Sequence, residues 1–326
     1  MSKRTTIQGK KKEKENGAEQ IQYVRSQNPF DFQIAEEKSA YGTHKPFSVY
    51  YNDLEHFVRL LKGDCIEILN LARENSIDMI FADPPYFLSN GGITCQAGRM
   101  VSVNKGEWDK SKGAEADHEF ALRWLTACHR VLKDDGTIWV SGTMHNIYSV
   151  GFALQQLGYK FLNEICWYKP NASPNLSTRY FTHSHETVIW AAKSDKSKHQ
   201  FDYQLMKQMA GGKQMRSLWM DIAVDGDPQD IWSIPTPPSA EKKFGKHPTQ
   251  KPLALLERVI LASTRPGDTV LDPFTGSSTT GAAAIRYERR FIGIDTNTEY
   301  LDLSLKRLKE ELARISDKPR LIKELA

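Results

Sequence analysis

The chain has 326 residues, 40% of them hydrophobic and 26% charged, which is enough to bury the core of one large domain or two smaller ones. Its net charge of +4 is compatible with a polyanionic partner but is weak evidence for one. No apolar run approaches the length of a membrane span and no signal peptide is recognisable, so we expect a cytoplasmic protein without a membrane partner. The four cysteines lie at least 30 residues apart, which excludes a CxxC zinc or redox motif and suits free thiols.

Residues 1–45 predict a basic, disordered arm. Six lysines and arginines fall within the first 20 residues, with almost no apolar residue among them. A solvated tail is the simpler interpretation, and salt-sensitive contact with nucleic-acid phosphates is the alternative. We expect order to begin near Phe47.

The first strong signal is an apolar strand that ends abruptly in a polar loop. A strand over 57–64 and a helix over 65–75 lead to a strand over 79–82, which runs directly into Asp83-Pro84-Pro85-Tyr86. The two prolines restrict the backbone, so Asp83 leaves the strand end in a set direction with an aromatic ring close by. A carboxylate, main-chain carbonyls and an aromatic face suit a planar ring that bears an amine. The plainer interpretation is an ordinary turn at a strand end.

Residues 87–112 predict a long loop directly after this tip. The segment contains four glycines and three lysines, including Lys105. Long loops in compact domains are usually functional lids or disordered, and the position of this one favours a lid or a nucleic-acid-contacting loop.

The next elements alternate between helix and strand. Apolar spacing predicts a helix over 119–133, a strand over 137–141, a helix over 146–157 and strands over 161–168 and 187–192. This alternation predicts a mostly parallel sheet with helices on both faces.

Residues 194–245 interrupt that alternation with a polar segment rich in Gly and Pro. Basic side chains, among them Lys213 and Arg216, are interleaved with aromatic ones. Such an insert is suited to reading DNA edges and backbone, and an oligomer contact or plain surface is the alternative interpretation.

A second signature follows in the last third of the chain. A helix begins near Pro252, and a strand over 269–271 then enters a turn of small residues, 272–281, that opens an Ala-rich helix. Small residues between strand and helix let a ligand approach backbone N–H groups where open α/β sheets bind cofactors. The next strand ends in Asp295, placed to accept the hydroxyls of a ribose; a helix cap is its simpler alternative role. A closing amphipathic helix spans 299–315.

Three motifs, in order, resemble the amino-methyltransferases of DNA: Asp83–Tyr86, the run Lys-His-Pro-Thr-Gln-Lys-Pro at 246–252, and Asp-Pro-Phe-Thr-Gly-Ser at 272–277. The catalytic motif precedes the cofactor motif, which is the circularly permuted order of the β class. The resemblance covers about residues 47–312. It implies a Rossmann-like α/β methyltransferase sheet with a catalytic half over 46–193, a target-recognition insert over 194–245 and an S-adenosylmethionine-binding half over 246–326.

The resemblance also assigns roles to residues. Asp83, Pro84, Pro85 and Tyr86 are the expected catalytic residues, with a flipped base stacked on Tyr86. The expected cofactor-binding residues are Asp64, His247, Thr249, Lys251, Asp272, Phe274, Gly276, Ser277 and Asp295. Lys105, Lys213 and Arg216 are the expected DNA-binding residues. No metal is implied. Ser278 stands where the family usually has a second glycine, and we expect it to fit with a negative φ and slightly altered cofactor packing.

Details of 87–109 are similar to the second adenine methyltransferase of DpnII-type restriction systems, which favours adenine N6 in GATC as the target. Details of 145–148 and 175–176 are similar to cell-cycle-regulated methyltransferases, so GANTC is the competing site, and cytosine N4 is the alternative base. The implied partners are DNA, a second copy of the chain and a cognate restriction endonuclease in a prokaryotic or phage setting. A nicotinamide oxidoreductase is disfavoured because 272–281 is not G-x-G-x-x-G, and a non-catalytic DNA-binding module is disfavoured because Asp83 and Tyr86 are both present.

Overall fold

The computed structural model describes residues 47–316, except 90–92, 97–98, 103–105, 107–108, 173, 220–235 and 246. The predicted basic arm, Lys105 and the middle of the predicted insert therefore lie outside the described residues. Within the described part, no helix is long and apolar enough to cross a membrane.

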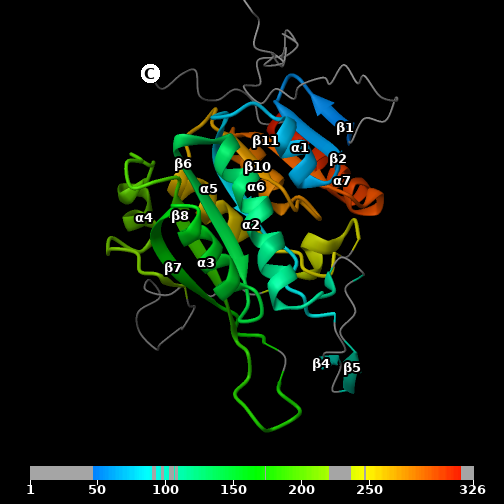
Figure 1. The fold of residues 1–326 in the computed structure, drawn as a ribbon. Coiled ribbons are helices and arrows are strands. Elements are labelled where there is room, and N and C mark those ends of the chain that lie inside the picture. Colours follow the sequence, from blue (N-terminus) through cyan, green and yellow to red (C-terminus); the bar gives the residue numbers. More distant parts are fainter. Residues whose placement is uncertain are drawn as a thin grey trace, which may run out of the picture.

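A nine-stranded sheet forms the centre of the molecule, in the order β1-β2-β11-β10-β3-β6-β8-β7-β9 (Figure 1). The strands from β2 to β6 in this order are parallel, whereas β1 and β8 run antiparallel to their neighbours. The strands of this sheet are β1 (Phe47–Asp53), β2 (Val58–Gly63), β3 (Ile77–Ala82), β6 (Leu132–Gly142), β7 (Lys160–Tyr168), β8 (His185–Ala192), β9 (Leu218–Trp219), β10 (Thr269–Asp272) and β11 (Arg290–Asp295). The mostly parallel α/β sheet is confirmed.

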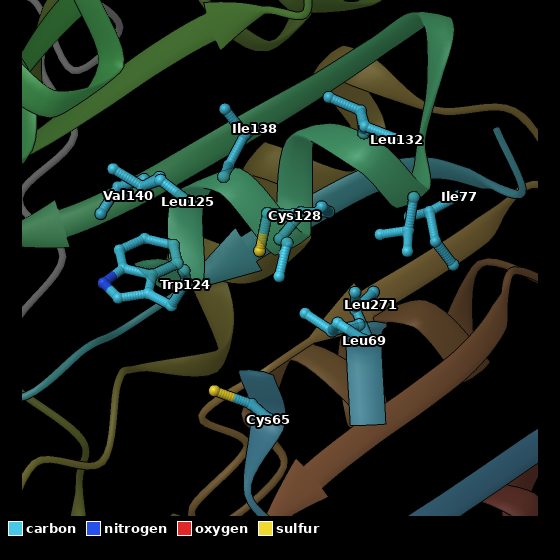
Figure 2. Packing of buried hydrophobic residues seen from close by; sticks show 14 of the residues in the cluster. Cys65, Leu69, Ile77, Trp124, Leu125, Cys128, Leu132, Ile138, Val140 and Leu271 are labelled. Atoms are coloured by element: carbon cyan, nitrogen blue, oxygen red, sulfur yellow. The ribbon is translucent and has the colours of Figure 1, made fainter. Parts of the chain in front are cut away.

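Helices cover both faces of this sheet. The helices are α1 (Cys65–Leu71), α2 (Ala114–Val131), α3 (Ile147–Gln156), α4 (Tyr203–Met209), α5 (Leu253–Ser263), α6 (Thr279–Arg286), α7 (Thr298–Ser316) and the 3₁₀ turn η2 (Ser239–Lys242). One apolar cluster joins the sheet to α1, α2 and α3 (Figure 2). A second cluster joins the opposite face to α5, α6 and α7.

Strand β3 shows why two separate cores form. Its side chains alternate, so Ile80 and Ala82 enter the first cluster while Met79 and Phe81 enter the second. A strand that is apolar on both sides is expected where helices cover both faces of a parallel sheet. The carboxyl end of β3 is therefore held firmly at the middle of the sheet.

Several elements differ from those expected. Strand β1 was not predicted, and a two-stranded hairpin of β4 (Ile93–Gln96) and β5 (Arg99–Ser102) lies inside the predicted loop 87–112. Helix α2 begins at Ala114, earlier than predicted, directly after Gly113, whose φ of 107° is not helical. It ends at Val131, and β6 already pairs with β3 at Leu132. The predicted insert contributes α4 and also β9, which extends the sheet beside β7.

Candidate active site

The polar loop that follows β3 lies beside the loop that follows β10. Both strands are parallel neighbours, so their carboxyl ends present Asp83 and Asp272 at the same edge of the sheet. In an open α/β sheet this edge is the usual position of a ligand site. The structure thus brings together the first and third motifs, which are separated by almost two hundred residues in the sequence.

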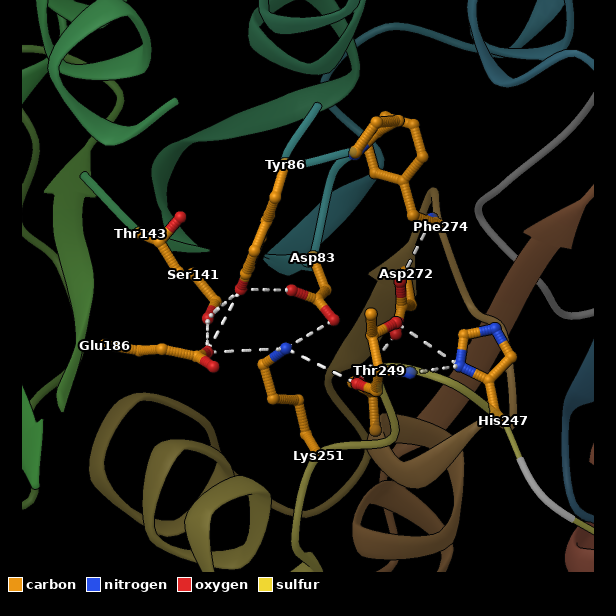
Figure 3. A network of polar contacts seen from close by, with 12 residues as sticks. Asp83, Tyr86, Ser141, Thr143, Glu186, His247, Thr249, Lys251, Asp272 and Phe274 are labelled. Carbon is orange, nitrogen blue, oxygen red and sulfur yellow. Dashed lines mark hydrogen bonds and ion pairs between the residues drawn. The ribbon is translucent and has the colours of Figure 1, made fainter. Parts of the chain in front are cut away.

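Asp83 is part of a buried hydrogen-bonded network (Figure 3). Its Oδ2 accepts a hydrogen bond from Lys251 Nζ at 2.6 Å, and its Oδ1 accepts one from the Tyr86 hydroxyl at 2.7 Å. The same hydroxyl lies 2.9 Å from Ser141 Oγ and 3.1 Å from Glu186 Oε2. Tyr86 is only 4% exposed, and the Lys251 ammonium lies 5.1 Å from the centroid of its ring.

The charges in this network set the ionisation of its carboxylates. Burial raises the pKa of Asp83, Lys251 opposes this rise, and Glu186 adds to it. Burial also acts to raise the pKa of Glu186, but Lys251 and Lys169 hold that pKa down at about 2. Lys169 Nζ donates to Glu186 Oε1 at 2.9 Å. Two carboxylates and two ammonium groups therefore form an overall neutral cluster.

A further buried carboxylate, that of Asp109, holds the backbone from Tyr86 to Ser89. Asp109 is fully buried and accepts hydrogen bonds from the backbone N–H groups of residues 86, 87 and 88 and from the Ser89 hydroxyl, at 2.8–3.2 Å. The Asn146 side chain donates to the carbonyl of Pro85 at 3.3 Å. These contacts hold the loop 83–89 from both sides, and they occupy the Pro85 carbonyl.

A cavity of about 240 Å³ opens beside this loop. It extends from the carboxyl ends of β2 and β11 to Asp83 and Pro85. Its walls are Gly63, Asp64, Cys65, Asp83, Pro85, Phe120, His247, Thr249, Pro273, Phe274, Gly276, Ile294, Asp295, Thr296, Asn297 and Tyr300. The apolar walls suit a planar ring, and the acidic groups at one end suit hydroxyls or amines. Among the expected cofactor-binding residues, this cavity brings together Asp64, His247, Thr249, Phe274, Gly276 and Asp295.

Two aspartates define the acidic end of the cavity. They follow adjacent parallel strands, Asp295 at the end of β11 and Asp64 directly after β2. Asp295 accepts the N–H of Gly276 at 3.0 Å and that of Asn297 at 2.8 Å, and burial raises its pKa to about 6. Asp64 Oδ1 caps α1 by accepting the N–H groups of Ile66 and Glu67. Both carboxylates are thus oriented by the backbone.

The turn 272–279 contributes Pro273, Phe274 and Gly276 to the walls of this cavity, and its Asp272 and Ser277 line a small adjoining pocket. Asp272 accepts hydrogen bonds from Thr280 Oγ1 at 2.6 Å and from the N–H of Phe274 at 3.1 Å, and burial raises its pKa to about 7. Ser277 does not line the cavity; its carbonyl and hydroxyl are bound by the Arg307 guanidinium on α7. Ser304, one helical turn earlier, donates to the carbonyl of Gly276 at 2.7 Å.

Ser278 departs from the conformation expected of it. Its φ of +51° and ψ of +43° are left-handed, so the expectation of a negative φ is wrong. The conformation favours glycine and costs another residue about 1–2 kcal/mol. A hydrogen bond of 2.8 Å between the Ser278 and Thr275 hydroxyls stabilises it.

The remaining candidates lie elsewhere. Lys251 contacts the Asp83 carboxylate and does not line the main cavity. Lys213 and Arg216 are exposed on the segment that leads to β9 and do not line the cavity. No group of three or more potential metal ligands occurs among the described residues. Three residues of this site were not predicted from the sequence: Glu186, Ser141 and Asp109. Glu186 could have been found, because it is the acidic residue near the start of the otherwise apolar strand β8.

The donor set fits S-adenosylmethionine. Carboxylates at the ends of β2 and β11 match an adenine amine and ribose hydroxyls, and the cavity extends from them to the catalytic loop. Gly276 leaves no room for a side chain, since a Cβ there would lie 2.8 Å from His247 Cε1. The His247 ring therefore packs directly against the backbone of this part of the cavity wall.

Comparison with known proteins agrees with this geometry. Residues 77–306 match the model of a family described as DNA methylase, of the N6 and N4 type. The chain is 52% identical over 263 residues to the type II methyltransferase M2.DpnII of Streptococcus pneumoniae, covering 80% of this chain and 92% of that protein. It is 48% identical over 261 residues to the type II methyltransferase M2.MboI of Moraxella bovis, covering 80% and 91%.

Solved structures show the same architecture. The crystal structure of an M1.HpyAVI–S-adenosylmethionine complex matches with a TM-score of 0.53 and 27% identity, over 77% of this chain and 98% of that one. The cytosine-N4-specific PvuII DNA methyltransferase matches with a TM-score of 0.56 and 22% identity, over 79% and 92%, which supports the fold alone. The chain therefore belongs to the DNA methylase family and is a site-specific, S-adenosylmethionine-dependent DNA methyltransferase.

Proposed function

We propose that this enzyme methylates N6 of an adenine that is flipped out of DNA, with GATC as its target sequence. The observation that carries the proposal is the position of Asp83, which faces both the cofactor cavity and the Tyr86 network. The target follows from the similarity of 87–109 to the second methyltransferase of DpnII-type systems, and the 52% identity to M2.DpnII supports it. GANTC and cytosine N4 are the competing targets.

The chemistry requires a group that makes an aromatic amine nucleophilic. The lone pair of N6 is delocalised into the adenine ring, so the site must hold the nitrogen with that lone pair directed at the methyl group. Asp83 and the Pro84 carbonyl are suited to accept the two N–H groups. S-adenosylmethionine supplies a methyl group on a positively charged sulfur. As the N–C bond forms, the S–C bond breaks with its electron pair left on sulfur, and N6 then releases one proton, which Asp83 can accept.

The cofactor assignments divide the cavity into three parts. We assign Asp64 to the adenine of S-adenosylmethionine and Asp295 to its ribose. His247 and Thr249 lie along the methionine portion, while Phe274 and Gly276 lie nearest its amino-acid end. Asp272 and Ser277 do not line this cavity, and we assign them a role through the backbone of the turn to which they belong.

The DNA surface is assigned from sequence and position. We assign the loop 87–112 with Lys105, and the insert 194–245 with Lys213 and Arg216, to contacts with DNA outside the flipped base. The segments 46–193 and 246–326 then act as the catalytic and cofactor-binding halves. A second copy of the chain and a restriction endonuclease with the same target are the further partners that the resemblance implies.

An Asp83→Ala substitution tests the catalytic assignment. Transfer of labelled methyl groups to DNA should be lost, while calorimetric titration should show S-adenosylmethionine affinity within about threefold of wild type, because Asp83 contributes only one wall of the cavity. Retained turnover would refute the assignment. Asp295→Ala is the matched variant, which should chiefly weaken cofactor binding.

A further inference from the structure

Lys251 lies where the target base would have to bind in the proposed reaction. In the proposed reaction the target amine hydrogen-bonds to Asp83 and the target base lies against Tyr86. Lys251 holds both places in the structure, with its ammonium 2.6 Å from Asp83 Oδ2 and 5.1 Å from the centre of the Tyr86 ring. The ammonium, like the target amine, is a nitrogen that donates hydrogen bonds.

We propose that Lys251 is an internal placeholder for the target base, and that Glu186 receives its ammonium when the base enters. The inference rests on the proposed function, since it takes Asp83 as the group that binds the target amine. Lys251 and Glu186 are then positioning residues, because they act through Asp83.

The geometry provides a second place for the ammonium at little cost. Lys251 Nζ already lies 3.6 Å from Glu186 Oε2 and 3.5 Å from the carbonyl of Thr249 (Figure 3). Closing the first distance to an ordinary hydrogen bond of about 2.8 Å moves the ammonium by roughly 1 Å. Burial makes such a partner necessary: Lys251 is only 7% exposed, and an unpaired ammonium there would be costly.

Glu186 is suited to this role, and its Oε2 already belongs to the same network through the Tyr86 hydroxyl. It does not line the cofactor cavity, and its other oxygen is bound by Lys169. The strand β8 that carries it is packed in the sheet between β6 and β7, so the carboxylate is fixed in place. Lys251 precedes Pro252 at the start of α5, so its backbone is restricted and the side chain makes the movement.

The charged groups around Asp83 predict opposite effects for the two residues. Asp83 is faced by Lys251 and Glu186 and, from the end of β10, by Asp272; Lys169 faces Glu186, and the Tyr86 hydroxyl donates to Asp83. Removing Lys251 leaves an excess negative charge beside Asp83. Replacing Glu186 with glutamine leaves an excess positive charge and weakens the second place for the ammonium, because only a neutral amide oxygen remains to accept it.

The test uses full-length protein and a duplex with 2-aminopurine at the target adenine, whose fluorescence rises when the base leaves the stack. Lys251→Ala should increase the ratio of flipped to stacked base about fivefold, since no buried hydrogen bond must be broken. Glu186→Gln should decrease the ratio about fivefold. Lys251→Arg keeps the charge and should stay nearest wild type. Equal changes in the same direction, or no change, would overturn the proposal.

A pH profile separates this role from a structural one. The rate of single-turnover transfer at saturating cofactor is measured against pH, and its fall at acid pH reports the protonation of Asp83. The midpoint of this fall should move up by about one pH unit in Lys251→Ala and down by about one pH unit in Glu186→Gln. A merely structural role would lower the rate at every pH and leave this midpoint in place, which also refutes the proposal. If Lys251→Ala does not fold, Lys251→Met replaces it. Transfer by the wild-type enzyme to unmodified duplex decides the proposed function separately.

Discussion

Substitution of Gly276 by alanine should damage both the fold and the cofactor cavity. Gly276 has a φ of +49°, and in that conformation a side chain costs about 1–2 kcal/mol. An added Cβ would also lie 2.8 Å from His247 Cε1 and 2.9 Å from its Nε2, closer than carbon atoms approach without a shift. Overpacking of this kind costs typically about 1–3 kcal/mol. The two effects together predict a loss of about 2–5 kcal/mol in the free energy of unfolding.

Gly267 offers a matched control for the part of this loss that comes from backbone strain. Its φ of +87° is also positive, but an added Cβ would meet nothing within 4 Å. Gly267→Ala should therefore cost only the conformational strain of about 1–2 kcal/mol. Urea denaturation of both variants measures the difference, provided that the slope of each transition is unchanged.

The cavity effect is specific to Gly276. Displacement of the His247 ring moves a wall of the cavity and its edge contact with Tyr300, and the Gly276 N–H is also the donor that orients Asp295. Calorimetric titration should show S-adenosylmethionine affinity at least tenfold weaker in Gly276→Ala, about 1.4 kcal/mol, and unchanged in Gly267→Ala. Equal destabilisation of the two variants with unchanged affinity would show that the His247 ring does not exclude a side chain at position 276.

Four further predictions follow from the same contacts. Burial raises the pKa of Asp272 from 3.8 to about 7, so the folded state binds more protons than the unfolded state between these pH values. The free energy of unfolding of the wild type should therefore fall as the pH rises from about 4 to about 7. The urea midpoint of Asp272→Asn should depend less on pH over the same range. Asp109→Asn keeps only one of two accepting oxygens, so it should cost at least about 2 kcal/mol and slow transfer more than it weakens cofactor binding, as measured by denaturation and kinetics. Ser278→Gly relieves left-handed strain but loses the hydroxyl contact with Thr275, so its stability should stay within about 1 kcal/mol of wild type. Lys213→Ala and Arg216→Ala should each weaken DNA binding and reduce its salt dependence by about one unit of slope without changing cofactor affinity.

Local pattern was enough to predict most of the sheet. The apolar run at Met79–Ala82 predicted a strand because it ends abruptly in a polar loop with two prolines, and the structure confirms the strand. The run of small residues at 272–281 likewise predicted a turn between a short strand and a helix, and the structure has this turn between β10 and α6. These features depend on neighbours in sequence, which a single chain displays directly.

Contacts between distant segments could not be predicted in this way. Glu186 lies 100 positions from Tyr86, and the pairing of β8 with β6 brings it to the loop that follows β3. Lys251 was grouped with His247 and Thr249 because they share one sequence motif, yet its side chain contacts Asp83 while the other two line the cavity. The left-handed backbone conformation of Ser278 is likewise imposed by the tight turn and could not be predicted from a serine at this position.

The most direct test is to incubate the purified enzyme with methyl-labelled S-adenosylmethionine and unmethylated bacterial DNA, and then to identify and map the labelled base. We expect N6-methyladenine confined to GATC, absent when Asp83 is replaced by alanine. N6-methyladenine confined to GANTC, or N4-methylcytosine, would contradict the proposed target. No labelled base in a protein that binds the cofactor would contradict the proposed function itself.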